Sequence, residues 1–215
     1  YILLGLIMNF NNKFKSLKLS KKNYIKKNFI KAFILGIISL NGTLHTLYPM
    51  IYSLKWNDNL IHSYGAFYAA NDITGLILVS KLPTTTIFHH VATSCLIIYS
   101  FTINFNTPGV GRLMMIYFMF SCYSFLVNFY LGLRYLKTEK DSYINNIIYY
   151  SRRCAYYLYF GCCLCNWAIH IYMTYNSIIN NEYNWSYTLY LSLLIPIIRD
   201  DLILLTWLQD KKNSF

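Results

Sequence analysis

Apolar residues in this chain gather in long segments, and this pattern restricts the fold more than any other feature. A helix needs about 20 apolar residues to cross a hydrocarbon core about 30 Å thick, because it rises about 1.5 Å per residue. Segments of this kind are Ala32 to Leu54, Tyr64 to Leu82, Thr84 to Phe105, Leu113 to Leu136, Tyr156 to Tyr175 and Tyr187 to Leu208. The sequence therefore predicts an all-α fold, a polytopic membrane helical bundle of six to seven transmembrane helices.

The seventh helix of that bundle would include Tyr1 to Phe10, which is too short to span a bilayer by itself. Because the chain opens on Tyr rather than Met, we expect this piece to be the end of a helix that begins upstream. It lacks the basic start and the small-residue cleavage site of a signal peptide.

Composition favours the same class. Of the 215 residues, 56% are hydrophobic and only 13% are charged, whereas soluble domains carry about 25% charged residues. We expect a partial first helix and a basic cytosolic loop over residues 1–31. A transmembrane domain would follow over residues 32–208, with a cytosolic tail over residues 209–215, and no room remains for a second domain.

Basic residues predict the side of the membrane on which each connection lies, because short loops rich in Lys and Arg stay in the cytosol. The segment from Lys13 to Lys31 is rich in lysine and has no acidic residue. If it is cytosolic, the connections alternate along the chain. Those inside would hold Lys81, Arg134 to Arg153, and Lys211 with Lys212, and those outside would be Asn104 to Gly111 and Asn176 to Trp185.

The net charge of +11 does not indicate nucleic-acid binding. The lysines flank apolar helices and belong to no motif that reads bases. We interpret them as topology determinants and as contacts for anionic lipid headgroups. The predicted partners are membrane lipids and acyl chains, with no nucleic acid, and a homo-oligomer is left open.

Polar residues within the spans recur at three- and four-residue spacing, so each span presents one polar face. Such faces can hydrogen-bond helices to one another, at about 0.6 to 2 kcal/mol per contact. Alternatively, they can line a cavity for lipid. The residues that this second interpretation places in the cavity are Asn41, His45, Tyr68, Asn71, Thr93, Ser94, Ser124 and Asn128.

His89 and His90 are adjacent near the start of one span, and Asp72 lies within the span before it. Ionisable residues inside a membrane are costly and mark candidate functional sites. Consecutive helix positions point about 100° apart, so the two histidines cannot both serve one packing contact. We expect a catalytic site of His89, His90 and Asp72, in which the carboxylate orients a histidine base.

Three chemistries fit a histidine pair. A metal centre is not expected, because the chain has five histidines and lacks repeated His-x-x-His-His boxes. A fatty-acid elongase would use one such box, but here Thr86 occupies its first position. In acyl transfer, a histidine deprotonates an amine or hydroxyl that attacks a thioester. No cofactor is expected, and acyl-CoA would be a co-substrate.

The order of these motifs resembles the TLC-domain family, the membrane domain of ceramide synthases and of smaller TLC domain-containing proteins, and is closest to the smaller members. The resemblance covers about residues 32–175. Its motifs are Gly42-Thr43-Leu44-His45 with Tyr52-Ser53-Leu54-Lys55-Trp56, then Tyr64-Gly65-Ala66-Phe67-Tyr68 leading to Asn71-Asp72, then His89-His90, and finally Ser121 to Asn128 with Leu133-Arg134-Tyr135. It implies an endoplasmic reticulum or other endomembrane location.

The chain departs from ceramide synthases where chemistry is concerned. Those enzymes carry a His-Asp-x-x-Asp stretch after the histidine pair, and the matching region here, Phe120 to Phe125, has no acid. The resemblance therefore implies a protein of lipid homeostasis that binds acyl lipids in its bundle. The alternative is a sphingolipid N-acyltransferase with the histidine pair as general base and the face from Asn41 to Tyr52 lining an acyl tunnel.

The cluster Arg199-Asp200-Asp201 falls inside the last apolar segment, shortly after Pro196. We expect the span to end near Ile198 and the remaining apolar residues to lie at the membrane interface, because charges and a proline disfavour a continuous membrane helix. If the helix instead continues, Asp200 or Asp201 supplies a carboxylate that the usual family position lacks.

Overall fold

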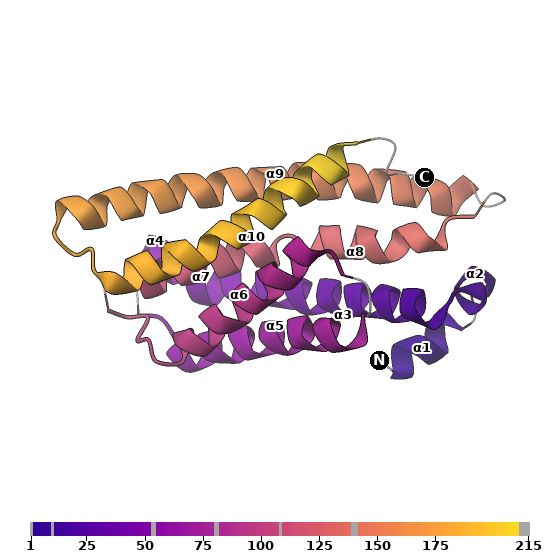
Figure 1. The fold of residues 1–215 in the computed structure, drawn as a ribbon, viewed down its shortest axis with the longest axis horizontal. Helices are drawn as coiled ribbons and strands as arrows, with labels where there is room; N and C mark the ends of the chain where they lie inside the picture. The colour runs from indigo at the N-terminus through magenta and orange to yellow at the C-terminus, as the bar shows by residue number, and fades with distance from the viewer. Residues whose placement is uncertain are drawn as a thin grey trace.

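The computed structural model describes residues 2–9, 11–52, 55–79, 82–107, 109–138 and 142–210. Within these ranges all regular structure is helical, with no strand, which confirms the all-α class (Figure 1). The elements are α1 Ile2–Met8, α2 Asn12–Ser16, α3 Leu19–Gly42, the π-helical turn η1 Thr43–Leu47, α4 Tyr48–Ile51, α5 Asp58–Leu78, α6 Thr84–Ser100, α7 Val110–Cys122, α8 Phe125–Leu133, the 3-10 turn η2 Arg134–Leu136, α9 Ser142–Ile179 and α10 Trp185–Gln209. Lys81, Lys211 and Lys212 lie outside the described residues.

The long helices form an elongated bundle in which α9 runs along one edge and α3 with α5 along the opposite edge (Figure 1). Helices α7 and α8 lie between these edges, and α8 packs on both α3 and α9. Helices α6 and α10 cross the bundle obliquely and contact each other. This crossing brings α10, which is last in the chain, against the helix that carries the histidine pair.

Each apolar segment predicted to span corresponds to helix, with different limits. Helix α9 extends over 38 residues, well beyond the predicted Tyr156 to Tyr175. The predicted segment Leu113 to Leu136 is divided at Tyr123 and Ser124, between α7 and α8. Among the described residues, two helices are long and apolar enough to cross a membrane by length and composition, and these cover Leu19–Leu47 and Val110–Leu136.

The basic segment Lys13 to Lys31 is helical except at Leu17 and Lys18, which separate α2 from α3. The Asn11 side chain accepts a hydrogen bond from the Phe14 amide at 3.0 Å and caps α2. Helix α3 then begins at Leu19, because lysine is a good helix former and apolar residues fall between the lysines at helical spacing. Its inner face buries Lys27 and Lys31.

Helix α10 continues through Pro196 to Gln209, so Asp200 and Asp201 lie within a helix, as in the second of the two alternatives. Proline removes one helical hydrogen bond and disfavours a helix interior. Here a buried stripe on both sides of the proline holds the helix against the bundle. That stripe comprises Tyr187, Tyr190, Leu194, Ile197, Asp201, Leu205 and Leu208. Packing of the stripe outweighs the local effect of the proline, and it carries Asp201 inward.

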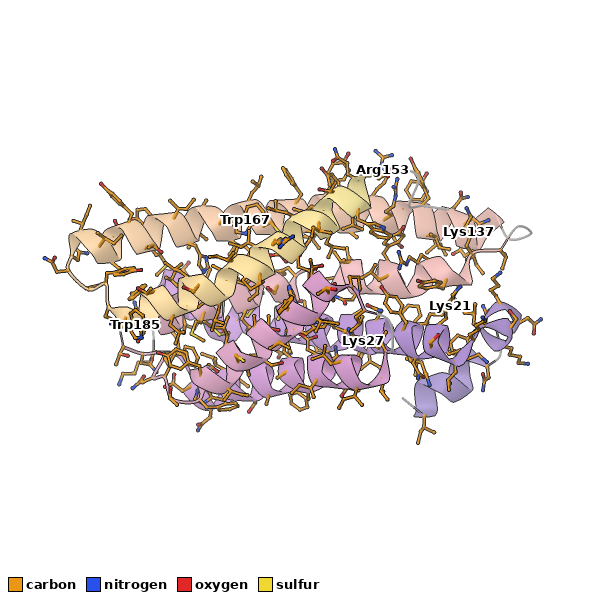
Figure 2. All side chains as sticks on the ribbon, in the orientation of Figure 1. Lys21, Lys27, Lys137, Arg153, Trp167 and Trp185 are labelled. Atoms are coloured by element: carbon orange, nitrogen blue, oxygen red, sulfur yellow. The ribbon has the colours of Figure 1, made fainter. Side chains whose placement is uncertain are left out.

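Large apolar side chains are exposed around the bundle as well as buried in it, for example Phe33, Phe67, Ile77 and Ile171. Labelled basic side chains, including Lys21, Lys137 and Arg153, lie toward the end that holds α2, and Trp185 lies at the other end (Figure 2). Apolar flanks with one basic end are typical of proteins that contact a bilayer.

Candidate functional site

Ionisable side chains from helices far apart in sequence meet in the interior of the bundle. Lys27 and Lys31 come from α3, Asp72 from α5, His90 from α6 and Asp201 from α10, and all are at least nine-tenths buried. Buried charges are strongly unfavourable unless each has a partner of opposite charge or a hydrogen-bonding group. The partners belong to two groups of contacts. One surrounds Asp72, and the other surrounds Asp200, the neighbour of Asp201.

The first group of contacts surrounds Asp72, which has no exposed surface. Its Oδ1 forms an ion pair with Lys31 Nζ, and its Oδ2 lies 3.1 Å from His90 Nδ1. The other ring nitrogen of His90, Nε2, lies 3.1 Å from Lys27 Nζ. Both nitrogens of His90 therefore face charged groups, and the ring closes a chain of contacts that links α3, α5 and α6.

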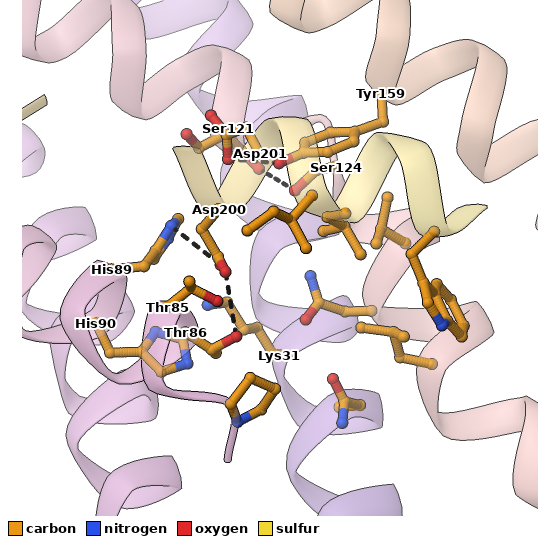
Figure 3. Close-up of a pocket in the computed structure, with 18 of the residues that line it drawn as sticks. Lys31, Thr85, Thr86, His89, His90, Ser121, Ser124, Tyr159, Asp200 and Asp201 are labelled. Atoms are coloured by element: carbon orange, nitrogen blue, oxygen red, sulfur yellow. Dashed lines mark hydrogen bonds and ion pairs between the residues drawn. The ribbon is translucent and has the colours of Figure 1, made fainter. Parts of the chain in front are cut away.

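The second group of contacts is centred on His89 and Asp200 (Figure 3). His89 Nδ1 lies 3.5 Å from Asp200 Oδ2, and the Thr86 hydroxyl donates to Asp200 Oδ1 at 3.2 Å. Among the described residues no hydrogen bond to His89 Nε2 is present, and the ring lines a cavity. One nitrogen of His89 is thus held toward a carboxylate, while the other stays available.

Asp201 is anchored by two tyrosines from other helices. Tyr117 of α7 donates to Asp201 Oδ2, and Tyr159 of α9 donates to Oδ1 at 2.6 Å (Figure 3). These contacts fix α10 against α7 and α9 at the level of the site. Since Asp200 is the preceding residue, they also hold it at the height of His89.

A cavity of about 290 Å³ lies beside the cluster. Side chains that line it include Lys27, Lys31, Tyr68, Thr86, His89, His90, Tyr117, Ser121, Ser124, Asn128, Asp200 and Asp201. A second cavity of about 70 Å³ adjoins it, and Tyr68, Tyr117 and Ser121 line both. The walls of the second cavity are mainly apolar, among them Leu96, Met114, Phe118, Leu194 and Ile197.

The structure brings the three predicted catalytic residues together: His89 and His90 line the cavity, and Asp72 lies behind His90. The predicted cavity-lining residues, by contrast, do not all line one cavity. Tyr68, Ser124 and Asn128 line the larger cavity and Thr93 lines the smaller one.

Other predicted lining residues have different surroundings. Ser94 donates to the His90 carbonyl oxygen at 2.7 Å, a bond within α6 that neither joins two helices nor lines a cavity. Asn71 is buried but lines neither cavity. The prediction that Asn41 and His45 line a cavity is wrong, because both side chains are exposed on the outer side of α3 and η1. Tyr48 and Tyr52 are also exposed, so the face from Asn41 to Tyr52 forms no tunnel wall.

Sequence reasoning missed the two lysines of the site and named Asp200 only in the alternative in which the last helix continues. Lys27 and Lys31 lie four residues apart on the face that also holds Tyr24 and Asn28. That spacing was the available signal, because residues four apart share one side of a helix.

The comparisons with known proteins give no relative: no protein-family model matches the chain, and neither a curated protein nor a solved structure is similar to it. The resemblance to the TLC-domain family therefore stays a prediction from the motifs. What the site can do follows from its geometry. A histidine with one nitrogen held toward a carboxylate and the other open to a cavity has the arrangement of a general base, since the carboxylate stabilises the imidazolium that forms.

Proposed function

We propose that this is a multi-pass membrane protein of lipid homeostasis with six to seven transmembrane helices, located in the endoplasmic reticulum or another endomembrane. The lengths of α5, α6, α9 and α10, at 21, 17, 38 and 25 residues, support crossings beyond the two that composition identifies. Reporter fusions after Lys137 and after Glu182 test this topology. They should report opposite sides of the membrane, and the same side for both would contradict it.

The protein would bind an acyl lipid in its interior, and the adjoining cavities are the observation that carries this proposal. A lipid has a polar part and an apolar chain. The larger cavity combines the charged and polar groups of the site with apolar walls, and the smaller one is almost wholly apolar. The shared residues Tyr68, Tyr117 and Ser121 mark the position at which the polar part of a ligand would give way to its chain.

Identification of lipid that co-purifies with the protein tests this binding. We expect mass spectrometry to find acyl lipid in the wild type, and to find at least tenfold less in Ser121→Phe, because a ring at this position would fill the junction of the cavities. Ser192→Phe is the matched control, since Ser192 is exposed on α10 and lines neither cavity. Equal lipid in the two variants would contradict the proposed binding site.

Acyl transfer is the second candidate function, and the open Nε2 of His89 opposite its Asp200-facing nitrogen favours it. His89 would remove the proton of an amine or hydroxyl as that group attacks the thioester carbon of acyl-CoA, and Asp200 would stabilise the resulting imidazolium. The acyl C–S bond would then break, and the imidazolium would return the proton to the departing CoA thiolate. The carboxylate absent from Phe120 to Phe125 would thus come from α10. A sphingoid base is the acceptor that the motif resemblance suggests.

Ceramide formation in a host that lacks ceramide synthase tests the transfer. We expect wild-type chain to restore ceramide and His89→Gln to lower it at least a hundredfold, since a general base contributes about 10²- to 10⁴-fold. His45→Gln, the same substitution on the exposed face of η1, should match the wild type. If His89→Gln and wild type give equal ceramide, His89 is not the base; if the wild type gives none while lipid still co-purifies, the binding function alone remains.

A further inference from the structure

Arg134 differs from the other charged groups that line the larger cavity. It begins η2, directly after α8. Its guanidinium carbon lies 4.6 Å from the ring centre of Trp207, 4.8 Å from that of Tyr135 and 5.8 Å from that of Tyr24. Among the described residues no carboxylate lies within ion-pair distance of it. Its charge is therefore held by aromatic faces and is not neutralised by an acid.

In the described part of the chain, the hydrogen-bond partners of this guanidinium are the hydroxyls of two tyrosines, Tyr24 and Tyr135. Nη2 donates to the Tyr135 hydroxyl at 3.2 Å, and Nε is buried without a hydrogen-bond partner. An arginine side chain carries five N–H donors. Arg152 also has a buried Nε without a partner, but its Nη1 donates to the carbonyl oxygens of Leu208 and Asp210 at the end of α10.

Lys27 adds a second positive charge to the same cavity wall. Its Nζ contacts a histidine nitrogen and no carboxylate, and it lies one turn of α3 beyond Tyr24, whose ring Arg134 approaches. The acids of the cavity wall are engaged elsewhere: Asp200 with His89 and Thr86, and Asp201 with two tyrosines. The Lys27 ammonium is directed toward His90 of α6 and Gly75 of α5, so Arg134 is the cation at the α8 end of the cavity.

Trp207 places this end near the chain terminus that the sequence predicts to be cytosolic. It lies two residues before the end of α10 and lines the cavity together with Arg134. A ligand with an acyl chain in the apolar cavity would extend past His89 toward Arg134. Planar guanidinium groups suit phosphate oxygens, with which they form paired, charge-assisted hydrogen bonds.

We propose that Arg134 forms an anion subsite at the α8 end of the cavity, which binds a phosphate group of the ligand. If the phosphate belongs to a lipid, the inference rests on the proposed lipid binding. If it belongs to a soluble compound, the subsite does not depend on that proposal. The two sources of this chemistry are a phospholipid headgroup and a soluble phosphate ester.

Binding to the full chain in detergent micelles tests the subsite, with Trp207 fluorescence as the reporter. The probes are dioleoyl phosphatidic acid, dioleoylglycerol with the same chains but no phosphate, and inorganic pyrophosphate. We expect phosphatidic acid to bind at least tenfold more tightly than dioleoylglycerol, or pyrophosphate to bind measurably. In Arg134→Gln the affinities for phosphatidic acid and dioleoylglycerol should differ by no more than about twofold, and pyrophosphate binding should be lost. The affinity for dioleoylglycerol itself should be retained.

Matched variants separate this role from a loss of folding. Arg134→Lys keeps the charge and should retain part of the preference, and Arg153→Gln removes an exposed arginine that lines neither cavity and should retain all of it. If Arg134→Gln does not fold, the ratio of the affinities for phosphatidic acid and dioleoylglycerol in the wild type and in Arg134→Lys still tests the subsite. Equal wild-type affinity for both lipids together with no pyrophosphate binding overturns the subsite. Failure of every lipid to bind with pyrophosphate still bound overturns the lipid function instead.

Discussion

His89 and His90 are neighbours in the chain, yet the structure gives them opposite surroundings. His90 has a charged group at each ring nitrogen and is 5% exposed, whereas His89 has one nitrogen toward Asp200 and lines the cavity with the rest of its ring. The two rings are nearly perpendicular, with an interplanar angle of 88°. The two histidines therefore form one sequence motif but belong to different groups of contacts. His90 belongs to the network around Asp72, and His89 belongs to the site beside Asp200.

The carboxylates differ in the same way. Asp72 is wholly buried and faces Lys31, His90 and Thr93, whereas Asp200 is only partly buried and faces Thr86 and His89. We infer that the first network determines how α3, α5 and α6 pack, and that the second is arranged for a ligand. The comparison predicts that changes near Asp72 affect stability and that changes near Asp200 affect function.

The largest effect is expected for Asp72→Leu. Removal of this carboxylate leaves Lys31 as a buried charge without its acid, which lowers the free energy of unfolding by about 3 to 5 kcal/mol. Denaturant unfolding in detergent measures it. The double variant Lys31→Met with Asp72→Leu should recover most of this loss, since an apolar pair of similar volume is often as stable as a buried ion pair. No recovery in the double variant would mean that the two side chains do not act as a pair.

His90→Leu should have the next largest effect, about 1 to 3 kcal/mol, because Lys27 then lacks the nitrogen that it contacts. The same unfolding measurement applies. A smaller loss for His90→Leu than for His89→Leu would reverse the assignment of His90 to the network around Asp72.

Asp200→Asn sharpens the functional side of the comparison. We expect the free energy of unfolding to change by less than about 1 kcal/mol, because the group is partly exposed and its amide replacement can still accept from Thr86. Acyl transfer should fall at least tenfold, since the amide cannot stabilise an imidazolium. Ceramide yield at matched protein level measures the transfer, and an unchanged yield would remove Asp200 from the mechanism.

Thr86→Val is expected to have the smallest effect. It removes one hydroxyl donor to Asp200, which is worth about 0.5 to 1.5 kcal/mol, and keeps the shape of the side chain. Lipid binding should be unchanged and transfer should fall about two- to tenfold. A loss as large as that of Asp200→Asn would mean that Thr86 contacts the substrate itself.

The fold class and the core of the site were accessible from sequence. Apolar segments of spanning length predict the helices, and burial of ionisable groups is so unfavourable that Asp72, His89 and His90 could be singled out. The outward direction of Asn41 and His45 could not be predicted, because periodicity tells which residues share a face and not where that face points.

Two further features of the site have a tertiary cause. Lys27 and Lys31 belong to a lysine-rich segment, and only the presence of Asp72 and His90 on neighbouring helices explains their burial. Asp200 lies four residues after Pro196, and a proline locally favours a helix end. The buried stripe of α10 continues to Leu208, however, and its packing keeps this segment helical. In both places the partner lies on another helix, beyond the reach of a local pattern.

The length of α9 has a geometric consequence. Its 38 residues correspond to about 57 Å, nearly twice the hydrocarbon thickness of about 30 Å. If α9 crosses a bilayer as proposed, about 14 Å of its axial height stays outside the apolar layer even at a tilt of about 40°, the upper end of what membrane helices adopt. If the end that begins at Ser142 is cytosolic and all of the excess length lies there, roughly its first twelve residues, up to Arg153, extend into water as a helix. This segment would limit how close a second macromolecule can approach that end of the bundle.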